Sequence, residues 1–222
     1  MSDTLMIMLK PESFKVAIFG LGHVGVTTAY ALLLKGLTTE LVLFSRDIKK
    51  AEGEKADLEH GLPFYPRTTI TATSNYEDLS DTDLVIFTAG LGQKPGQTRL
   101  DLTKGNVDIL KSTIPKIVKH APRTLILMVT NPLDIMTYKA TELAGLPSGR
   151  VFGSGTLLDT ARFRLHLSKN ISINSTSIHA YILGEHGDSS FAPMSMATIG
   201  GKPLISFPEM SHDHIKWALE QT

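Results

Sequence analysis

The chain of 222 residues contains no cysteine, only one tryptophan and no excess of either charge. Without cysteine it can form neither disulfides nor thiolate-zinc sites, a composition compatible with a reducing cytoplasm. Its 22 basic residues balance 22 acidic ones, so no net charge attracts nucleic acid or an anionic membrane. The histidines, including the His212 and His214 pair, lack partners at metal-ligand spacing. We therefore expect a soluble, cytoplasmic enzyme or binding protein with no metal, nucleic-acid or membrane partner.

Long hydrophobic runs are also missing. Near the amino terminus only residues 5–9 are continuously apolar, no basic leader precedes them, and Pro11 follows closely. This segment is too short for a membrane span and lacks the flanks of a signal peptide. We expect residues 1–13 to form a loosely packed arm.

Short apolar runs alternate with longer helical patterns through most of the chain. The runs are continuously apolar, as is typical of strands buried on both faces of a parallel sheet. They predict strands at 15–20, 40–44, 69–73, 84–90, 124–130 and 150–155, and helices at 24–35, 48–60, 103–120 and 133–144. This order indicates an α/β fold with a doubly wound parallel sheet of the Rossmann type, in which ligands bind beyond the carboxyl ends of the strands.

The pattern changes after Gly155. It predicts a helix at 156–170, strand-like segments at 176–186 and 191–204, and a last helix for which Asp213 is a plausible N-cap. The apolar stripe of that last helix stops before it has made two turns. We interpret residues 154–222 as a second, α+β unit that ends inside a helix.

The segment GLGHVG follows the first predicted strand and precedes a helix. In this context Gly20, Gly22 and Gly25 permit a tight turn, the approach of a pyrophosphate and close helix packing. A tight turn without a ligand is the alternative. We predict that residues 14–153 form a dinucleotide-binding domain.

Two loops that follow later strands carry polar side chains. Residues 90–102 are rich in glycine and include Gln93 and Arg99, which predicts a mobile loop; a bland surface loop would have the same composition. Asn131 follows the fifth strand in TNPLD, on the side where ligands bind, and its alternative role is to cap the next helix.

Two further segments carry candidate catalytic groups. Asp159 and Arg162 are spaced i, i+3 on one helical face, with Arg164 turned elsewhere, and a local ion pair is the simpler explanation. His186 lies between glycines in LGEHGDSS, where a carboxylate partner would make it an acid or base near neutral pH. A turn histidine with no catalytic role is the alternative.

Taken together, these motifs resemble the lactate and malate dehydrogenases, and among them the bacterial L-lactate dehydrogenases. The resemblance runs from VAIFGLGHVG through AEGEKADLEHG, DLVIFTAG, QKPGQTRLDL, TNPLD, GSGTLLDTARFR and IHAYILGEHGDS to IGGKPL. It implies an NAD-dependent enzyme that transfers hydride between nicotinamide and pyruvate or L-lactate. Another L-2-hydroxy acid, or malate, is the alternative substrate.

The resemblance also implies roles for the catalytic side chains. His186 would exchange a proton with the substrate oxygen, and Asp159 would orient it. Arg162 would hold the substrate carboxylate in a two-pronged pair. Arg99 would polarise the carbonyl as the loop closes, and Asn131 would hydrogen-bond near the same oxygen and the nicotinamide.

Gln93 separates the two branches of the family. The malate dehydrogenases place an arginine at this position to meet the second carboxylate of their substrate. A neutral glutamine leaves that carboxylate unpaired, which favours lactate.

For the cofactor, the resemblance implies contacts from the glycine turn, including His23 and Val24, and from Gly90 and Asn131. Family members that are activated by fructose 1,6-bisphosphate bind it across a subunit interface through positions matched here by Arg164 and His179. The family is typically tetrameric, so a homotetramer is expected. The alternative is that both residues are ordinary polar surface residues.

Ser45 stands where the family places an aspartate that binds the adenosine ribose. Arg46 follows it, and removal of the carboxylate removes repulsion toward a 2′-phosphate, which Arg46 could pair with. We hypothesise that NADP is accepted beside NAD. In the alternative, Arg46 points to solvent and NAD binds less tightly.

Family members continue past the position of Thr222, so we expect the substrate domain to be incomplete. A dinucleotide-binding remnant without turnover is therefore a second hypothesis, because an unfinished domain exposes apolar surface and cannot exclude water from a site.

Overall fold

The structure is a computed structural model that describes residues 13–92 and 99–222, except for the side chains of residues 99–101 and 170. Most of the predicted amino-terminal arm and Gln93 lie outside the described residues. Contacts divide the chain into two compact units, Met1–Gly153 and Ser154–Thr222. Each unit is described by itself.

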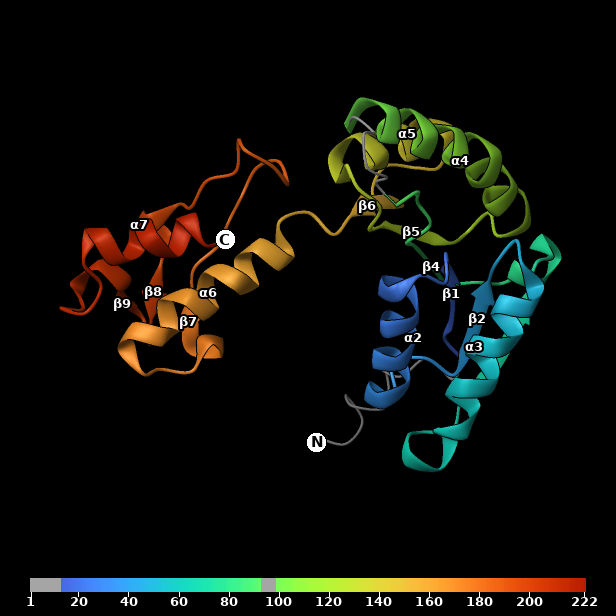
Figure 1. The fold of residues 1–222 in the computed structure, drawn as a ribbon, viewed down its shortest axis with the longest axis horizontal. Coiled ribbons are helices and arrows are strands. Elements are labelled where there is room, and N and C mark those ends of the chain that lie inside the picture. Colours follow the sequence, from blue (N-terminus) through green and yellow to red (C-terminus); the bar gives the residue numbers. More distant parts are fainter. Residues whose placement is uncertain (1–12, 93–98) are drawn as a thin grey trace, which may run out of the picture. The chain divides into compact units, whose positions relative to one another are not determined.

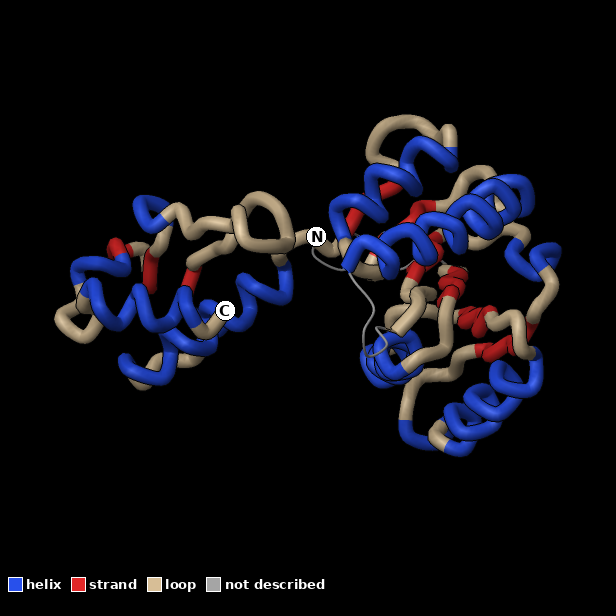
Figure 2. The backbone as a smooth tube through the Cα atoms, turned by 45° about the horizontal axis from the view of Figure 1, so that its top comes forward, coloured by secondary structure: helices blue, strands red, loops and turns tan. Residues whose placement is uncertain are grey.

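The first unit contains a six-stranded sheet in the order β3-β2-β1-β4-β5-β6 (Figures 1 and 2), and every neighbouring pair is parallel. Its strands are β1 (Lys15–Phe19), β2 (Glu40–Phe44), β3 (Thr69–Thr73), β4 (Leu84–Phe87), β5 (Leu125–Met128) and β6 (Val151–Gly153). The strand order reverses between β1 and β4, which confirms the predicted doubly wound Rossmann fold.

Helices cover both faces of this sheet because successive side chains of each strand point in opposite directions. They are α2 (His23–Lys35), α3 (Ile48–His60), α4 (Arg99–His120) and α5 (Leu133–Ala144). On β1, Val16 and Ile18 pack in the core formed with α2 and α3, whereas Ala17 and Phe19 pack in the core formed with α4 and α5. Figure 1 shows α4 and α5 together, apart from α2 and α3.

Three adjacent strands end in phenylalanine at the same level of the sheet. Phe19 is in register with Phe44 on one side and with Phe87 on the other. The rings of Phe19 and Phe44 stack with centroids 4.1 Å apart, and those of Phe19 and Phe87 stack at 5.9 Å. We call these three residues the phenylalanine ladder. It forms an apolar floor at the carboxyl ends of β1, β2 and β4.

Several predicted boundaries need correction. The first, fourth, fifth and sixth strands are shorter than predicted. Beyond the ends of β4 and β5, threonine hydroxyls bond backbone carbonyls: Thr88 donates to the carbonyl of Gly20 and Thr130 to that of Ala89. The predicted loop at 90–102 is also shorter, since α4 begins at Arg99.

The second unit is built on α6 (Leu157–Ile171). It adds β7 (Ile178–His179), β8 (Thr198–Ile199) and β9 (Lys202–Pro203), which form an antiparallel sheet, and α7 (His212–Glu220).

Short 3-10 helices occur in both units. Those of the first unit are Leu62–Phe64 and Tyr76–Leu79, and those of the second are Ser175–Ser177, Met194–Met196 and Leu204–Ser206. The long strand-like segments predicted at 176–186 and 191–204 are wrong, because only two-residue strands form within them.

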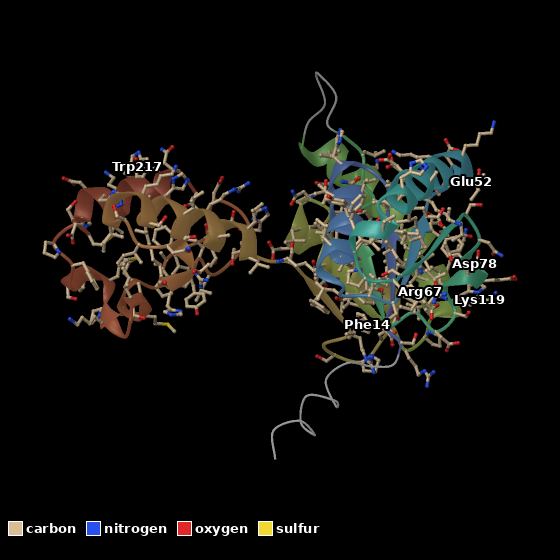
Figure 3. The ribbon with its side chains drawn as sticks, turned by 90° about the horizontal axis from the view of Figure 1, so that it is seen from below. Phe14, Glu52, Arg67, Asp78, Lys119 and Trp217 are labelled. Carbon is tan, nitrogen blue, oxygen red and sulfur yellow. The ribbon has the colours of Figure 1, made fainter. Side chains whose placement is uncertain are left out.

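The last helix begins differently from the prediction. Ser211, not Asp213, is the N-cap of α7, and its hydroxyl accepts a hydrogen bond from the backbone N–H of His214. Asp213 lies in the first turn, where a negatively charged carboxylate interacts favourably with the positive end of the helix dipole. The single tryptophan, Trp217, lies on this helix (Figure 3).

Within the described residues, no helix is long and apolar enough to cross a membrane.

The packing of α2 gives a test of the first core. Leu33 is fully buried, whereas its neighbour Leu34 is 48% exposed. We expect Leu33→Ala to lower the free energy of unfolding by about 2–5 kcal/mol, and Leu34→Ala to change it by about 0.5 kcal/mol or less. Urea unfolding followed by circular dichroism measures both. Equal losses for the two variants would contradict the assignment of the buried face.

Candidate active site

The glycine turn between β1 and α2 fits tightly against the next strand. A Cβ atom on Gly20, whose φ is +98°, would lie 2.5 Å from the Cα of Ala89. A Cβ atom on Gly25 would lie 2.0 Å from the carbonyl oxygen of Gly20, so the first turn of α2 must pack directly on the strand end. On Gly22 a Cβ atom would meet nothing within 4 Å. Gly22 is also the N-cap of α2, which has no side-chain cap.

A cavity of about 350 Å³ lies above the glycine turn in the first unit. Residues from the ends of β1, β2 and β4, from the start of α3 and from α4 line it: Phe19, Gly20, Leu21, Gly22, Phe44, Ser45, Arg46, Asp47, Lys50, Thr88, Ala89, Gly90, Leu91, Ile109, Ser112 and Thr113. Part of the phenylalanine ladder therefore forms the floor of the cavity. Its place at the strand-order reversal is where this fold binds ligands.

At one end of this cavity the chain leaves β2 through Ser45, Arg46 and Asp47. The hydroxyl of Ser45 accepts a hydrogen bond from the N–H of Asp47, and the carboxylate of Asp47 accepts one from the N–H of Lys49 as the N-cap of α3. The backbone N–H of Gly20 donates to the carbonyl of Phe44 at 3.4 Å. This bond keeps Ser45 next to the glycine turn.

Asn106, which was not predicted as a site residue, connects two loops at the strand ends. It is 2% exposed on α4. Its side-chain oxygen accepts from the N–H of Leu91, and its side-chain nitrogen donates to the carbonyl of Asn131. Asn106 is therefore a positioning residue for the segments of Gly90 and Asn131. The sequence signal that could have indicated this role is the position of a polar residue one helical turn before the buried Leu110, on the same face of α4.

The side chain of Asn131 does not cap the next helix. Pro132 is the N-cap of α5, and no side chain satisfies that end of the helix. The alternative role that the sequence left open for Asn131 is thus wrong.

In the second unit, one carboxylate meets both candidate catalytic side chains. Asp159 Oδ2 lies 2.6 Å from His186 Nδ1, and Asp159 Oδ1 lies 3.3 Å from Arg162 Nη1. The side chain of Asp159 is 12% exposed, that of His186 26% and that of Arg162 46%. Since the carboxylate faces Nδ1, the neutral imidazole carries its proton on that nitrogen.

Three side chains of α6 hold the segment that leads to His186. Thr160 accepts a hydrogen bond from the N–H of Ile182, Thr156 donates to the carbonyl of Ile182, and Arg164 donates through Nε to the carbonyl of Ala180 at 2.7 Å. These bonds replace the strand partners that the apolar pattern predicted. They fix the segment along α6, close to Asp159.

A backbone bridge closes the loop that carries His186. Leu183 and Phe191 exchange two hydrogen bonds, and Gly184 takes a φ of +97° beside the bridge. Within the loop, Ser189 donates to the carboxylate of Glu185 at 2.7 Å. The position of His186 is therefore set from α6 on one side and from the bridge on the other.

Arg164 and His179 come from neighbouring segments. The guanidinium of Arg164 bonds the carbonyl of Ala180 and lies 4.7 Å from the ring centroid of Tyr181, while His179 is exposed on β7. The printed partners of Arg164 thus lie in the segment that follows β7.

His23 and Val24 are exposed residues in the first turn of α2. Gln93 is outside the described residues, and so is the side chain of Arg99. Over the described part of the chain there is no group of three or more His, Cys, Asp or Glu residues that could hold a metal ion.

Family comparison matches residues 14–153 to the lactate/malate dehydrogenase NAD binding domain, and residues 156–221 to the lactate/malate dehydrogenase alpha/beta C-terminal domain. The chain belongs to the lactate/malate dehydrogenase family. This confirms the resemblance that the motifs indicated.

Its relatives include L-lactate dehydrogenases. That of Acetivibrio thermocellus is 47% identical over 198 residues, which cover 89% of this chain and 62% of the relative. That of Synechococcus sp. is 48% identical over 208 residues, covering 93% of this chain and 68% of the relative. The chain thus spans less than two thirds of the length of the Acetivibrio relative.

Solved structures give the same result. A lactate dehydrogenase from a Medee basin deep-sea metagenome library matches with a TM-score of 0.88 at 43% identity, covering 94% of this chain and 68% of that one. The minor L-lactate dehydrogenase from Enterococcus mundtii, in its ligands-bound form, matches with a TM-score of 0.89 at 40% identity, with the same coverage.

The glycine turn fits a nicotinamide dinucleotide. Gly22 leaves open space at the cavity, and the first N–H groups of α2 have no side-chain acceptor there. A helix end of this kind favours a pyrophosphate. Gly20 and Gly25, by contrast, are needed for the fold itself, because a side chain at either position would collide with backbone.

This difference gives a paired prediction. We expect Gly22→Ala to leave the free energy of unfolding within about 0.5 kcal/mol of the parent, while it weakens NADH binding about tenfold by placing a methyl group in the pyrophosphate path. We expect Gly25→Ala to lower stability by about 1–3 kcal/mol. Fluorescence titration with NADH and urea unfolding separate the two effects. Unchanged NADH affinity in Gly22→Ala would show that the pyrophosphate does not pass over Gly22.

Proposed function

We propose that this chain carries the chemistry of an NAD-dependent L-lactate dehydrogenase, which interconverts pyruvate and L-lactate. The observation that carries the proposal is the bridging position of Asp159 between His186 and Arg162. The family membership and the cavity at the glycine turn support it. When bound, the nicotinamide would accept or supply the hydride.

His186 is the proton donor and acceptor in this proposal. A carboxylate 2.6 Å from Nδ1 fixes the orientation of the ring, so the proton that is transferred sits on Nε2. In pyruvate reduction Nε2 gives this proton to the carbonyl oxygen as hydride reaches the carbon. In lactate oxidation it takes the proton back.

Arg162 binds the substrate carboxylate. Its planar guanidinium can form two parallel hydrogen bonds with a carboxylate, and the contact with Asp159 at 3.3 Å engages Nη1 on one edge. Close to half of the side chain is exposed, so a substrate can reach it. Arg162 thus fixes the orientation of a 2-oxo acid relative to His186.

Substrate choice rests on Gln93 and Arg99, which the sequence places in the loop before α4. Gln93 favours a monocarboxylate such as pyruvate over oxaloacetate, and Arg99 would stabilise the negative charge that develops on the carbonyl oxygen. Asn131 would contribute a hydrogen bond near the same oxygen. Another L-2-hydroxy acid with a small apolar side chain is the alternative substrate.

His186→Ala tests this proposal directly. We expect the turnover number for pyruvate reduction by the 222-residue chain to fall about 10²- to 10⁴-fold, because the proton donor is lost, while NADH affinity stays within about twofold. NADH absorbance and NADH fluorescence give the two values. For the parent, kcat/KM should fall as the pH rises, since the donor must be protonated.

The matched control is Ser189→Ala, which alters the same loop at a residue bonded to Glu185 and should retain most of the activity. Equal background rates in the parent and in His186→Ala, with NADH still bound, would favour the second hypothesis, a dinucleotide-binding remnant without turnover.

We also propose a cytoplasmic homotetramer whose activity responds to fructose 1,6-bisphosphate through Arg164 and His179. The hydrogen bond of Arg164 to Ala180 brings the guanidinium to the residue that follows His179. A guanidinium from α6 and an imidazole from β7 are suited to a phosphate group.

We expect the bisphosphate to convert sigmoidal pyruvate kinetics to hyperbolic kinetics, and His179→Ala to weaken this activation at least about fivefold. Initial rates against pyruvate, with and without bisphosphate, provide the measurement. Kinetics that do not change at saturating bisphosphate would rule out this regulation. His179→Ala is preferred to a change at Arg164, because Arg164 also holds the backbone at Ala180.

A further inference from the structure

The cavity at the glycine turn has an excess of positive charge where the chain leaves β2. The charged side chains that line it are Arg46, Asp47 and Lys50, two cations against one carboxylate. Among the described residues, neither Arg46 nor Lys50 forms an ion pair with an acidic side chain. The positive end of α3 lies at the same place.

The carboxylate of Asp47 is already engaged. Its Oδ1 accepts the N–H of Lys49 at 3.1 Å and so satisfies the first turn of α3. Ser45 differs, because its oxygen accepts the N–H of Asp47 at 3.1 Å and its hydroxyl hydrogen donates to no acceptor within the described residues. Ser45 therefore offers a donor to the cavity, where a carboxylate would offer only acceptors.

Arg46 lies near the aromatic residues that form the floor of the cavity. Tyr76 packs on Phe44 with ring centroids 4.7 Å apart. Burial raises the pKa of the Tyr76 hydroxyl, and the guanidinium of Arg46 partly opposes that rise. The charge of Arg46 thus lies close to the rings under the cavity.

Ser45 also lies next to the segment that would hold the pyrophosphate. The hydrogen bond from Gly20 to Phe44 joins the two strand ends, and Gly20, Gly22 and Ser45 line the same cavity. In a dinucleotide the adenosine ribose is bonded directly to the pyrophosphate. If the pyrophosphate lies over the glycine turn, the ribose therefore lies beside that turn. The end of β2 is the part of the cavity that this ribose reaches.

We propose that Ser45, Arg46 and Lys50 form a site for the 2′-phosphate of NADP(H), so that the chain accepts the phosphorylated cofactor as well as NAD(H). This inference rests on the proposed dinucleotide function. The guanidinium of Arg46 pairs with the phosphate, Lys50 adds a second positive charge, and the hydroxyl of Ser45 donates a hydrogen bond. A ribose without phosphate gains little from the two cations.

The test compares the dissociation constants of NADPH and NADH for the 222-residue chain, measured by nicotinamide fluorescence without substrate. We expect NADPH to bind within about tenfold of NADH or more tightly, and Arg46→Ala to weaken NADPH about tenfold while NADH changes by less than about twofold. Lys50→Ala should weaken NADPH by about threefold. The affinity for NADPH relative to that for NADH should fall as salt is raised, because exposed charges are screened.

Two variants serve as matched controls. Lys49→Ala removes an exposed cation from the same turn of α3 that does not line the cavity, and it should leave both dissociation constants unchanged. Ser45→Asp restores a carboxylate and should weaken NADPH at least about tenfold while it retains NADH binding.

The outcomes separate this inference from the proposed function. NADH binding with NADPH more than about a hundredfold weaker would overturn the 2′-phosphate site and leave the dehydrogenase proposal standing. Equal effects of Arg46→Ala on both cofactors, or equal effects of Arg46→Ala and Lys49→Ala on NADPH, would also overturn it. Failure of both cofactors to bind would overturn this inference together with the proposed cofactor function.

Discussion

The parallel register of β1, β2 and β4 determines where everything else in the first unit lies. Because Phe19, Phe44 and Phe87 are paired across the three strands, the strands end at one level and their rings stack into a continuous apolar floor. The chain leaves the sheet after each phenylalanine, so the glycine turn, the Ser45 segment and the Thr88 segment lie side by side at the carboxyl ends of the strands. A shift of one residue in any strand would move one ring to the opposite face and remove part of the floor.

The second unit solves a different problem, which is to hold a histidine on an irregular segment. Regular sheet is almost absent around His186, so the backbone between Ile178 and Phe191 finds its partners on α6 and in one isolated bridge. The same helix also supplies Asp159 and Arg162. The proposed acid-base group His186, the carboxylate of Asp159 and the guanidinium of Arg162 therefore share one rigid support, as a site with fixed geometry requires.

Sequence reasoning was most accurate where burial alone decides structure. The second and third strands and the helices at 48–60 and 133–144 have the predicted bounds, because continuous apolar runs and helical spacing are local signals. It failed where backbone groups pair with side chains, as in the segment bonded to Thr160. It also chose the wrong N-cap for α7, because both Ser211 and Asp213 are residue types that favour that position. The contact of Asp159 with His186, 27 residues later, carries no local signal and was expected only from the family resemblance.

The single tryptophan has a practical consequence. Trp217 lies in the second unit (Figure 3), with its ring centroid 5.4 Å from that of His166 and 5.6 Å from that of His214. Residues 1–153 contain no tryptophan. Emission excited at the red edge of the protein absorbance thus comes from the second unit alone. The chain contains its own optical label, which lets the melting of the unit with His186 be followed separately from that of the unit with the glycine turn.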